Sequence, residues 1–504
     1  MTSHASHDAY AAYKQQKELF TTYAWWTVIQ PRLLAQTSSR KLANPSSTWR
    51  PFVIEFTVLV WPLLASLTIL SRNPLLLNGI IVSLTYATCQ VSLPPTSPPL
   101  SPTQPRTSSP FLDSPTERDQ KRAQRQVDSP SKLFIKPFVT VYRAHMMLMT
   151  VICILAVDFK VFPRQFAKAE TWGTSLMDLG VGSFVFSLGL ISALPLLKST
   201  RRLPFLIAAW KVIKKSFGVI VLGIVRVIMV KGVDYPEHLS EYGTHWNFFF
   251  TLGLLPVFGV MFERWSPKLD FHAMALAVTL VHQTLLSKTS LQSWTLEAAR
   301  TTIWSHNKEG LVSLPGYLAI FLLGTGTGLY VLPPDPYFYR ILHAYPSRDM
   351  TKEAREKLED KKKRMWQSKP GKLANLLGSY AVIWWTLYAV MRWLGVPVSR
   401  RIANLPYVIW TAAFNCSFLF LYLSIHLWAT KAPMTRSVQA PALFEAINRN
   451  SLVVFLIANL LTGLVNVTIE TMYASTMVAM VVLVCYNVAV AASAWLLRHQ
   501  RLRI

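Results

Sequence analysis

The sequence predicts an all-α fold, a bundle of transmembrane helices, from three observations. The chain has 504 residues, of which 52% are hydrophobic and only 15% are charged, whereas about 25% of residues are charged in soluble proteins. Apolar stretches near 20 residues recur along the chain, and a helix of that length crosses a bilayer. The stretches are continuous rather than alternating, which excludes a membrane barrel, the other fold that pairs its backbone inside lipid.

Twelve stretches are long and apolar enough to be spans. They lie at about 52–71, 75–92, 140–158, 173–197, 209–230, 246–263, 268–287, 311–332, 374–395, 405–427, 450–469 and 474–497. A further stretch, 291–304, is short and carries Glu297 and Arg300. It is either a thirteenth span or a helix at the membrane surface, so the residues leave 12 or 13 spans open.

Composition divides the chain into four parts. Residues 1–50 lack the charged-then-apolar pattern of a signal peptide and leave room for an interfacial helix. Residues 51–92 hold the first two spans, and 93–138 is so rich in Pro and Ser that we expect it to be disordered. Residues 139–504 form a single multi-span core with a basic loop at 333–373, which holds eleven Lys and Arg.

The net charge of +26 comes largely from loops between spans. The positive-inside rule places the loop 333–373 and the arginines at 498–503 in the cytosol. The basic loops 93–138 and 198–208 also lie in the cytosol if 291–304 does not cross, and they lie on the opposite side of the membrane if it does. Cations that flank spans fit anionic lipid headgroups, so no nucleic-acid partner is expected.

The familiar catalytic motifs are missing. The four cysteines, Cys89, Cys153, Cys416 and Cys485, have no metal or redox spacing, and we expect neither a metal nor a cofactor. The sequence contains no Walker A, HExxH or GxSxG motif and no helix lined with charges. Its polar residues gather instead at the ends of spans, which is typical of an enzyme that handles a lipid at the membrane edge.

Four polar clusters at these ends are the candidate functional residues, because polar groups at the edge of a membrane are costly. In the first, the apolar run MMLMTVICILAV leads directly into Asp158 and is followed by four more charged residues. In the fourth, three polar residues are spaced by seven and four, on one helical face. The clusters are Asp158 to Glu170; EYGTHWNFFFTLG (241–253); SHNKEGLVSLPGYLAIFLLGTGTG (305–328); and FLIANLLTGLVNVTIET (455–471), with Asn459, Asn466 and Glu470.

Each cluster also has a purely structural interpretation, which the sequence leaves open. Lys160, Arg164 and Lys168 can extend along apolar surface to reach the membrane interface, with Asp158 as a cap or ion partner. The asparagines of 455–471 can link helices by hydrogen bonds, and the histidines of the second and third clusters can be ordinary interfacial residues.

Four motifs in order resemble a known family. WGTSLMDLGVGSFVF, GTHWNFFFTL, NKEGLVSLPGYLAIFLLG and ANLLTGLVN resemble the glucosaminyl-phosphatidylinositol inositol acyltransferases of the fungal and animal GPI-anchor pathway, over about 140–497. The resemblance implies a multi-pass endoplasmic-reticulum membrane enzyme, usually drawn with about 13 spans, and so favours a crossing at 291–304. It implies transfer of a palmitoyl-type chain from acyl-CoA, a co-substrate, to the inositol 2-hydroxyl of glucosaminyl-phosphatidylinositol. Membrane lipids surround such an enzyme, and no obligate protein partner is evident.

The resemblance also implies which residues act. Asp158 and Lys168 match the family's catalytic pair, and the chemistry agrees, because a hydroxyl needs a base within hydrogen-bond reach and partial burial raises the pKa of a carboxyl group. Lys168 would orient this base or stabilise the oxyanion, and the Gly180–Gly182 stretch would leave space for an acyl chain. Lys160 and Asp178 are unassigned and serve as comparison residues. The expected substrate-binding residues are Trp172, Gly180, Val181, Gly182, His245, Trp246, Asn247, His306, Asn307, Asn459 and Asn466.

Two other classes of protein remain. A transporter or flippase for a lipid would also place polar groups at broken helices, and a membrane scaffold subunit would tolerate any polar change that preserves folding. If Asp158 and Lys168 can be neutralised without loss of product, one of these two classes is favoured. If only Asp158 proves dispensable, His245 is the next candidate base.

Overall fold

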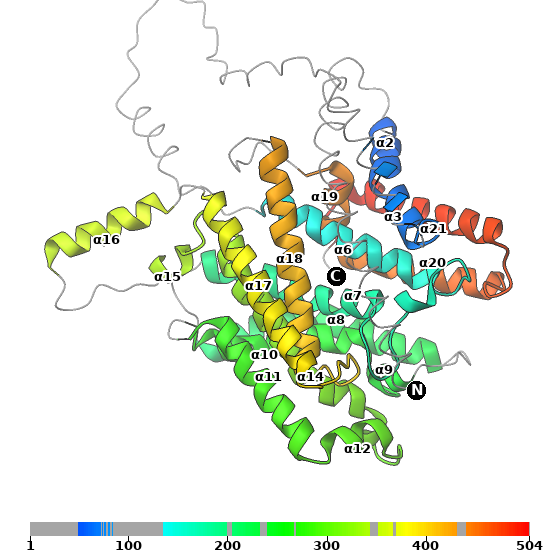
Figure 1. Ribbon diagram of the computed structural model, residues 1–504, viewed down its shortest axis with the longest axis horizontal. Coiled ribbons are helices and arrows are strands. Elements are labelled where there is room, and N and C mark those ends of the chain that lie inside the picture. Colours follow the sequence, from blue (N-terminus) through cyan, green and yellow to red (C-terminus); the bar gives the residue numbers. More distant parts are fainter. Residues whose placement is uncertain are drawn as a thin grey trace, which may run out of the picture.

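The computed structural model describes most of the chain as helix (Figure 1). The described residues are 49–71, 73, 75–76, 79–80, 83, 135–198, 204–231, 239–266, 269–342, 351–365, 369–430 and 440–502. They contain no β-strand, and the predicted all-α class is confirmed. Residues 1–48, most of the second predicted span and the Pro/Ser-rich loop up to residue 134 lie outside the described residues.

Seven helices are long and apolar enough to cross a membrane. They are α6 (Pro137–Ala156), α7 (Leu176–Lys198), α14 (Lys308–Val331), α17 (Pro370–Trp393), α18 (Leu405–Thr430), α20 (Ser451–Thr468) and α21 (Thr476–Leu496). Three more long helices are shorter or more polar: α8 (Phe205–Lys231), α10 (Phe248–Glu263) and α11 (Phe271–Lys288). The apolar stretch Pro51–Leu67 forms α2 (Arg50–Leu59) and α3 (Trp61–Leu67). The described residues therefore give a polytopic bundle but do not reach a count of 13 spans.

Short helices connect the long ones. They are α9 (Leu239–Tyr242), α12 (Leu291–Glu297), α13 (Ile303–His306), α15 (Phe338–Leu342), α16 (Lys352–Arg364) and α19 (Ala442–Arg449), with single turns η1 (Arg164–Phe166) and η2 (Leu497–His499). Local chemistry explains where several helices begin. Pro137 stands in the first turn of α6, where its missing N–H costs nothing. The side chain of Asn247 accepts hydrogen bonds from two backbone N–H groups that open α10.

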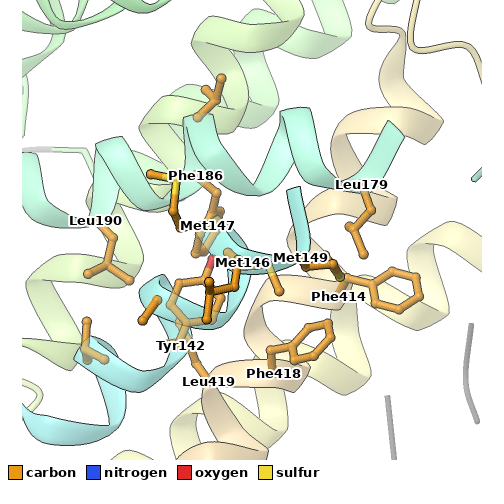
Figure 2. Close-up of a cluster of buried hydrophobic side chains, with 14 of the residues drawn as sticks. Tyr142, Met146, Met147, Met149, Leu179, Phe186, Leu190, Phe414, Phe418 and Leu419 are labelled. Carbon is orange, nitrogen blue, oxygen red and sulfur yellow. The ribbon is translucent and has the colours of Figure 1, made fainter. Parts of the chain in front are cut away.

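The centre of the bundle is formed by α6, α7, α14 and α18. Figure 2 shows methionine and aromatic side chains of α6 meeting Leu179 and Phe186 of α7 and Phe414 and Phe418 of α18. Helices α7 and α14 approach so closely that a Cβ on Gly189 would lie 2.1 Å from the Phe321 carbonyl oxygen. Small residues allow this backbone contact, the usual means of packing helices where lipid supplies no hydrophobic drive.

The stretch 291–304 forms no helix long enough to cross a membrane, so the expected crossing is not confirmed. Its helix α12 has only seven residues, whereas a crossing helix needs about 20. Helices α11 and α14 on either side run antiparallel: His272 at the start of α11 lies 3.2 Å from Thr327 near the end of α14, and Leu286 packs with Val312 at the other end. Both helices therefore reach the same face at 291–304.

The helix ends meet on two faces. On the first, called here the Asp158 face, the segment 157–175 contacts α9 and the 395–404 connection. On the opposite face, Lys136 just before α6 donates to the Pro333 carbonyl at the start of the basic loop. The described end of the loop before α6 therefore lies on the same face as the start of 333–373. Helix α7 runs parallel to α14, because Phe186 lies beside Gly324 and Leu190 beside Gly328, so it ends on that face too. The sequence predicts this arrangement for a stretch 291–304 that does not cross.

Candidate active site

Asp158 follows directly after the last turn of α6, on the Asp158 face. Its side chain is half-buried, and its Oδ2 accepts a hydrogen bond of 2.9 Å from Nδ2 of Asn466, near the end of α20. Burial raises the pKa of Asp158, while the Asn466 hydrogen bond and the charges of Arg164 and Lys168 oppose the rise. The carboxylate is thus held by one neutral partner in a setting that makes it a stronger base than an exposed aspartate.

The segment 157–175 that carries Asp158 has little regular structure but is firmly packed. Phe159, Phe162 and Phe166 are each at most 1% exposed, and the rings of Phe162 and Phe166 meet edge to face at 5.9 Å. Three aromatic anchors over eight residues bury enough apolar surface to order a short connection. The backbone between them is therefore held in place at the edge of the bundle.

Lys168 lies in the same segment, but its direct partner is Glu241 of α9. The ammonium and the Glu241 carboxylate are 2.7 Å apart, whereas Lys168 acts on Asp158 through its charge. The structure therefore brings the two predicted catalytic residues into one neighbourhood without a direct ion pair between them.

A buried ion network holds the backbone around Lys168. Asp178, in the first turn of α7, is fully buried and lies 2.6 Å from Nε of Arg400, which is 4% exposed. Its other oxygen accepts from the Ala169 N–H at 3.1 Å and from Ser175 at 2.7 Å. Arg400 also lies 3.7 Å from Glu241, so one guanidinium joins both acids that position Lys168.

Sequence reasoning missed this network. Asp178 stands in WGTSLMDLG as a charge within an apolar helix start, a signal of burial, but Arg400 is separated from it by 222 positions and no spacing rule connects them. Asp178 was chosen as a comparison residue without a role, and that choice is wrong, because its carboxylate compensates the charge of the buried Arg400 guanidinium. Lys160 remains suitable: it is exposed and stacks over the ring of Tyr473 at 5.8 Å.

The second and third sequence clusters form one junction. The backbone N–H of His245 donates to Oδ1 of Asn307 at 2.9 Å, and the rings of His245 and His306 lie 6.1 Å apart. Asn247 caps α10 and donates to the Gly223 carbonyl of α8 at 2.8 Å. The polar groups of both asparagines are therefore engaged with the protein itself.

Two other residues of these clusters are engaged as well. The indole of Trp246 donates to Thr251 at 3.0 Å. Glu309 is fully buried between two guanidinium groups, those of Arg300 at 2.6 Å and Arg401 at 2.8 Å. These charges tie 291–304 and the 395–404 connection to the start of α14.

The Gly180–Gly182 stretch does not leave the space that was expected. A Cβ on Gly182 would lie 2.7 Å from two side-chain atoms of Thr411, and one on Gly180 would lie 3.3 Å from Thr150. Neighbouring helices fill the room that these glycines provide, so the expectation of room for an acyl chain is wrong at Gly182. Val181 between them is partly buried against the core.

The remaining candidates divide between site and scaffold. Asn459 donates to the Phe455 carbonyl of its own helix at 2.7 Å, whereas Asn466 contacts Asp158 and its Oδ1 is buried without a hydrogen-bond partner. Trp172 is 40% exposed. Among the described residues, no group of three or more His, Cys, Asp or Glu side chains is arranged to hold a metal ion.

The fold and these contacts define a class: a multi-pass helical membrane protein with a half-buried carboxylate among cations at the edge of its bundle. The GWT1 family model matches residues 13–497. The chain belongs to the GWT1 family.

Curated relatives carry the name GPI-anchored wall transfer protein 1. The relative from Aspergillus fumigatus is 37% identical over 506 residues, covering 95% of this chain and 92% of its own length. The relative from Schizosaccharomyces pombe is 40% identical over 362 residues, covering 72% of each chain. That from Cryptococcus neoformans serotype D is 45% identical over 392 residues, covering 73% of this chain. The match spans 63% of the Cryptococcus protein's length.

Proposed function

We propose that the protein is an inositol acyltransferase of GPI-anchor biosynthesis. It moves a palmitoyl-type chain from acyl-CoA to the inositol 2-hydroxyl of glucosaminyl-phosphatidylinositol, as a multi-pass protein of the endoplasmic-reticulum membrane. The observation that carries the proposal is the half-buried Asp158 carboxylate, which is bound by Asn466 and lies near the charges of Lys168 and Arg164. Membership of the GWT1 family, whose curated members are named for transfer of GPI-anchored wall proteins, supports it.

The reaction needs one base and one stabilised oxyanion. Asp158 takes the proton of the inositol hydroxyl, whose oxygen attacks the thioester carbonyl and forms a C–O bond. Negative charge develops on the carbonyl oxygen, and the Lys168 ammonium is the nearby cation suited to stabilise it. The intermediate collapses by breaking the C–S bond, and the proton on Asp158 passes to the departing CoA sulfur. No covalent acyl-enzyme and no cofactor is needed.

Asn466 has a supporting role in this scheme. Its amide group donates to Asp158 through Nδ2, which holds the carboxylate in one orientation. Its Oδ1 is buried without a partner and is free to accept a hydrogen bond from a substrate hydroxyl. Both halves of one amide would then contact the reacting pair.

The distribution of charge supports a site on the lumenal side of the membrane. The basic loop 333–373 lies on the face opposite Asp158 and belongs in the cytosol by the positive-inside rule. Asp158 and Asn466 would then face the lumen. An acceptor lipid would reach them along α20, which the other described helices leave largely uncovered.

An assay with purified protein tests the function. Acyl-CoA and glucosaminyl-phosphatidylinositol should give an acylated lipid that is resistant to inositol-specific phospholipase and separates by thin-layer chromatography. Asp158→Asn should lower the rate by about 10²–10⁴ and Lys168→Ala by about 10²–10³, with normal membrane insertion. The double variant should be little worse than the worse single one, because residues that act as a unit are not additive.

Lys160→Gln is the matched control and should retain nearly full rate. A flippase or a scaffold would give no acylated product with any variant. Near wild-type turnover by Asp158→Asn would reject the assignment of the base and direct attention to His245.

A further inference from the structure

We propose that Arg164 binds the phosphodiester of the acceptor lipid, beside the inositol hydroxyl that Asp158 deprotonates. This inference rests on the function proposed above and adds a substrate-recognition residue to it. Three features support it: Arg164 forms no ion pair among the described residues, it is held close to Asp158, and the substrate carries an anion at that place.

The charge of Arg164 differs from that of the other cations of the site. Lys168 is paired with Glu241, and Arg400 with Asp178. Arg164 has only neutral direct partners: NH1 donates to the Val157 carbonyl at 2.7 Å, and NH2 lies 3.5 Å from the sulfur of Met472. Within the described ranges, no carboxylate forms an ion pair with it. An exposed guanidinium with free N–H groups is left to bind an anion from outside.

Arg164 and Asp158 connect the same two parts of the chain. Val157, which accepts from Arg164, is the residue just before Asp158. Met472 lies in the connection after α20, the helix whose Asn466 holds Asp158. The guanidinium is therefore held on both sides close to the catalytic carboxylate, and its charge acts on the Asp158 side chain.

The chemistry of the acceptor supplies the anion. In phosphatidylinositol the phosphodiester is carried by the ring carbon next to the one that bears the 2-hydroxyl. A base that reaches this hydroxyl therefore has a phosphate within a few ångströms, and the two negative charges repel each other. A planar guanidinium with paired N–H donors fits a phosphate better than any other side chain. Among the described residues, Arg164 is the guanidinium near Asp158 that forms no ion pair.

Lys160 provides the matched control within the same segment. It is exposed and basic like Arg164, but its ammonium lies over the ring of Tyr473 and its charge is not among those that act on Asp158. Neutralising it changes the net charge of the segment by the same amount as neutralising Arg164. An effect of the segment's net charge would appear in both variants, and phosphodiester recognition only in the Arg164 variant. The neutral acceptor described below separates phosphodiester recognition from an effect of Arg164 on Asp158.

Steady-state kinetics in mixed micelles, at one fixed pH for all variants, test the proposal. Arg164→Gln should raise the KM for glucosaminyl-phosphatidylinositol about 10- to 100-fold, the cost of a lost hydrogen bond between charged groups. Its kcat should change by less than the KM, and its KM for acyl-CoA should stay as in the wild type. Arg164→Lys should recover part of the loss, and Lys160→Gln should behave like the wild type.

A second arm uses the substrate and needs no variant. With an acceptor whose phosphodiester is methylated to a neutral triester, the wild type should show the same rise in KM. Arg164→Gln should not differ from the wild type with this acceptor. An unchanged KM for the charged acceptor in Arg164→Gln overturns the inference, and so does a rise confined to acyl-CoA, which would place the CoA phosphates there. Absence of any product from the wild type would instead refute the proposed function.

Discussion

The sharpest structural prediction concerns Asp178→Asn, which removes one half of a buried ion pair. The substitution keeps the size of the side chain but takes away the charge that faces Arg400. It also replaces one oxygen with an NH₂ group, which only donates. One oxygen then remains, whereas the carboxylate accepts from both the Arg400 guanidinium and the Ala169 N–H. We expect loss of folded protein rather than loss of chemistry.

The structure sets the size of the effect. Asp178 is fully buried and Arg400 is 4% exposed, and breaking such a pair by removing one partner costs about 3–5 kcal/mol. Glu241 lies 3.7 Å from the same guanidinium and compensates part of its charge. We therefore expect the lower end, about 3 kcal/mol, which is about a hundredfold in the folding equilibrium.

Heating followed by size-exclusion chromatography measures the fraction of monodisperse protein for a double-mutant cycle. Asp178→Asn and Arg400→Gln should each lower the melting temperature clearly. The double variant carries no isolated charge and should melt higher than Asp178→Asn alone, because replacing both partners avoids the uncompensated ion.

Two results would refute this reasoning. A single Asp178→Asn variant that melts like the wild type would mean that the buried pair contributes nothing. A double variant no more stable than Asp178→Asn would mean that the uncompensated charge of Arg400 is not the cause. The same cycle in the acyltransferase assay separates a positioning effect on Lys168 from unfolding.

Three further predictions follow from the site and the fold. In the pH profile of kcat/KM, the rise on the acid side should have its midpoint above the ordinary aspartate pKa of about 3.9. Burial raises the pKa of Asp158, and the base acts only when ionised. Asn466→Ala removes a hydrogen bond that lowers this pKa and should move the midpoint to still higher pH. Gly182→Ala forces a Cβ against the side chain of a threonine on α18 and should cost about 1–3 kcal/mol in thermal stability. Cysteines placed in 93–138 and in 333–373 should react with an impermeant reagent from the same side of the membrane.

Each of these has a clear contrary outcome. A midpoint near the ordinary aspartate value, unmoved by loss of the asparagine, would remove Asp158 as the titrating base. For packing, Gly463→Ala is the control, because a Cβ there meets nothing within 4 Å; equal losses at both glycines would deny the close contact with α18. Labelling from opposite sides would mean that 291–304 crosses after all.

Length and hydropathy were sufficient for the membrane fold. Apolar stretches near 20 residues must be helical in lipid because no water is present to satisfy the backbone, and the helices α6, α7, α14, α18, α20 and α21 lie where the sequence predicts spans. The polar ends of these stretches also identified the segment around Asp158. Periodicity, however, describes each helix alone, so it could not decide whether 291–304 crosses; that follows from the antiparallel pairing of α11 with α14.

The assignment of partners came only from the tertiary structure. The sequence contained Asp158, Lys168 and Asn466 as separate polar residues, and the fold brought Asn466 onto Asp158 across 308 positions. In the folded chain Lys168 forms an ion pair with Glu241, Asp178 forms one with Arg400, and Thr411 occupies the space beside Gly182. The physical reason is the same in each case. A polar residue in an apolar stretch needs a partner, because burying it unpaired costs free energy. Which residue becomes the partner depends on how distant helices pack, and no local sequence pattern encodes that packing.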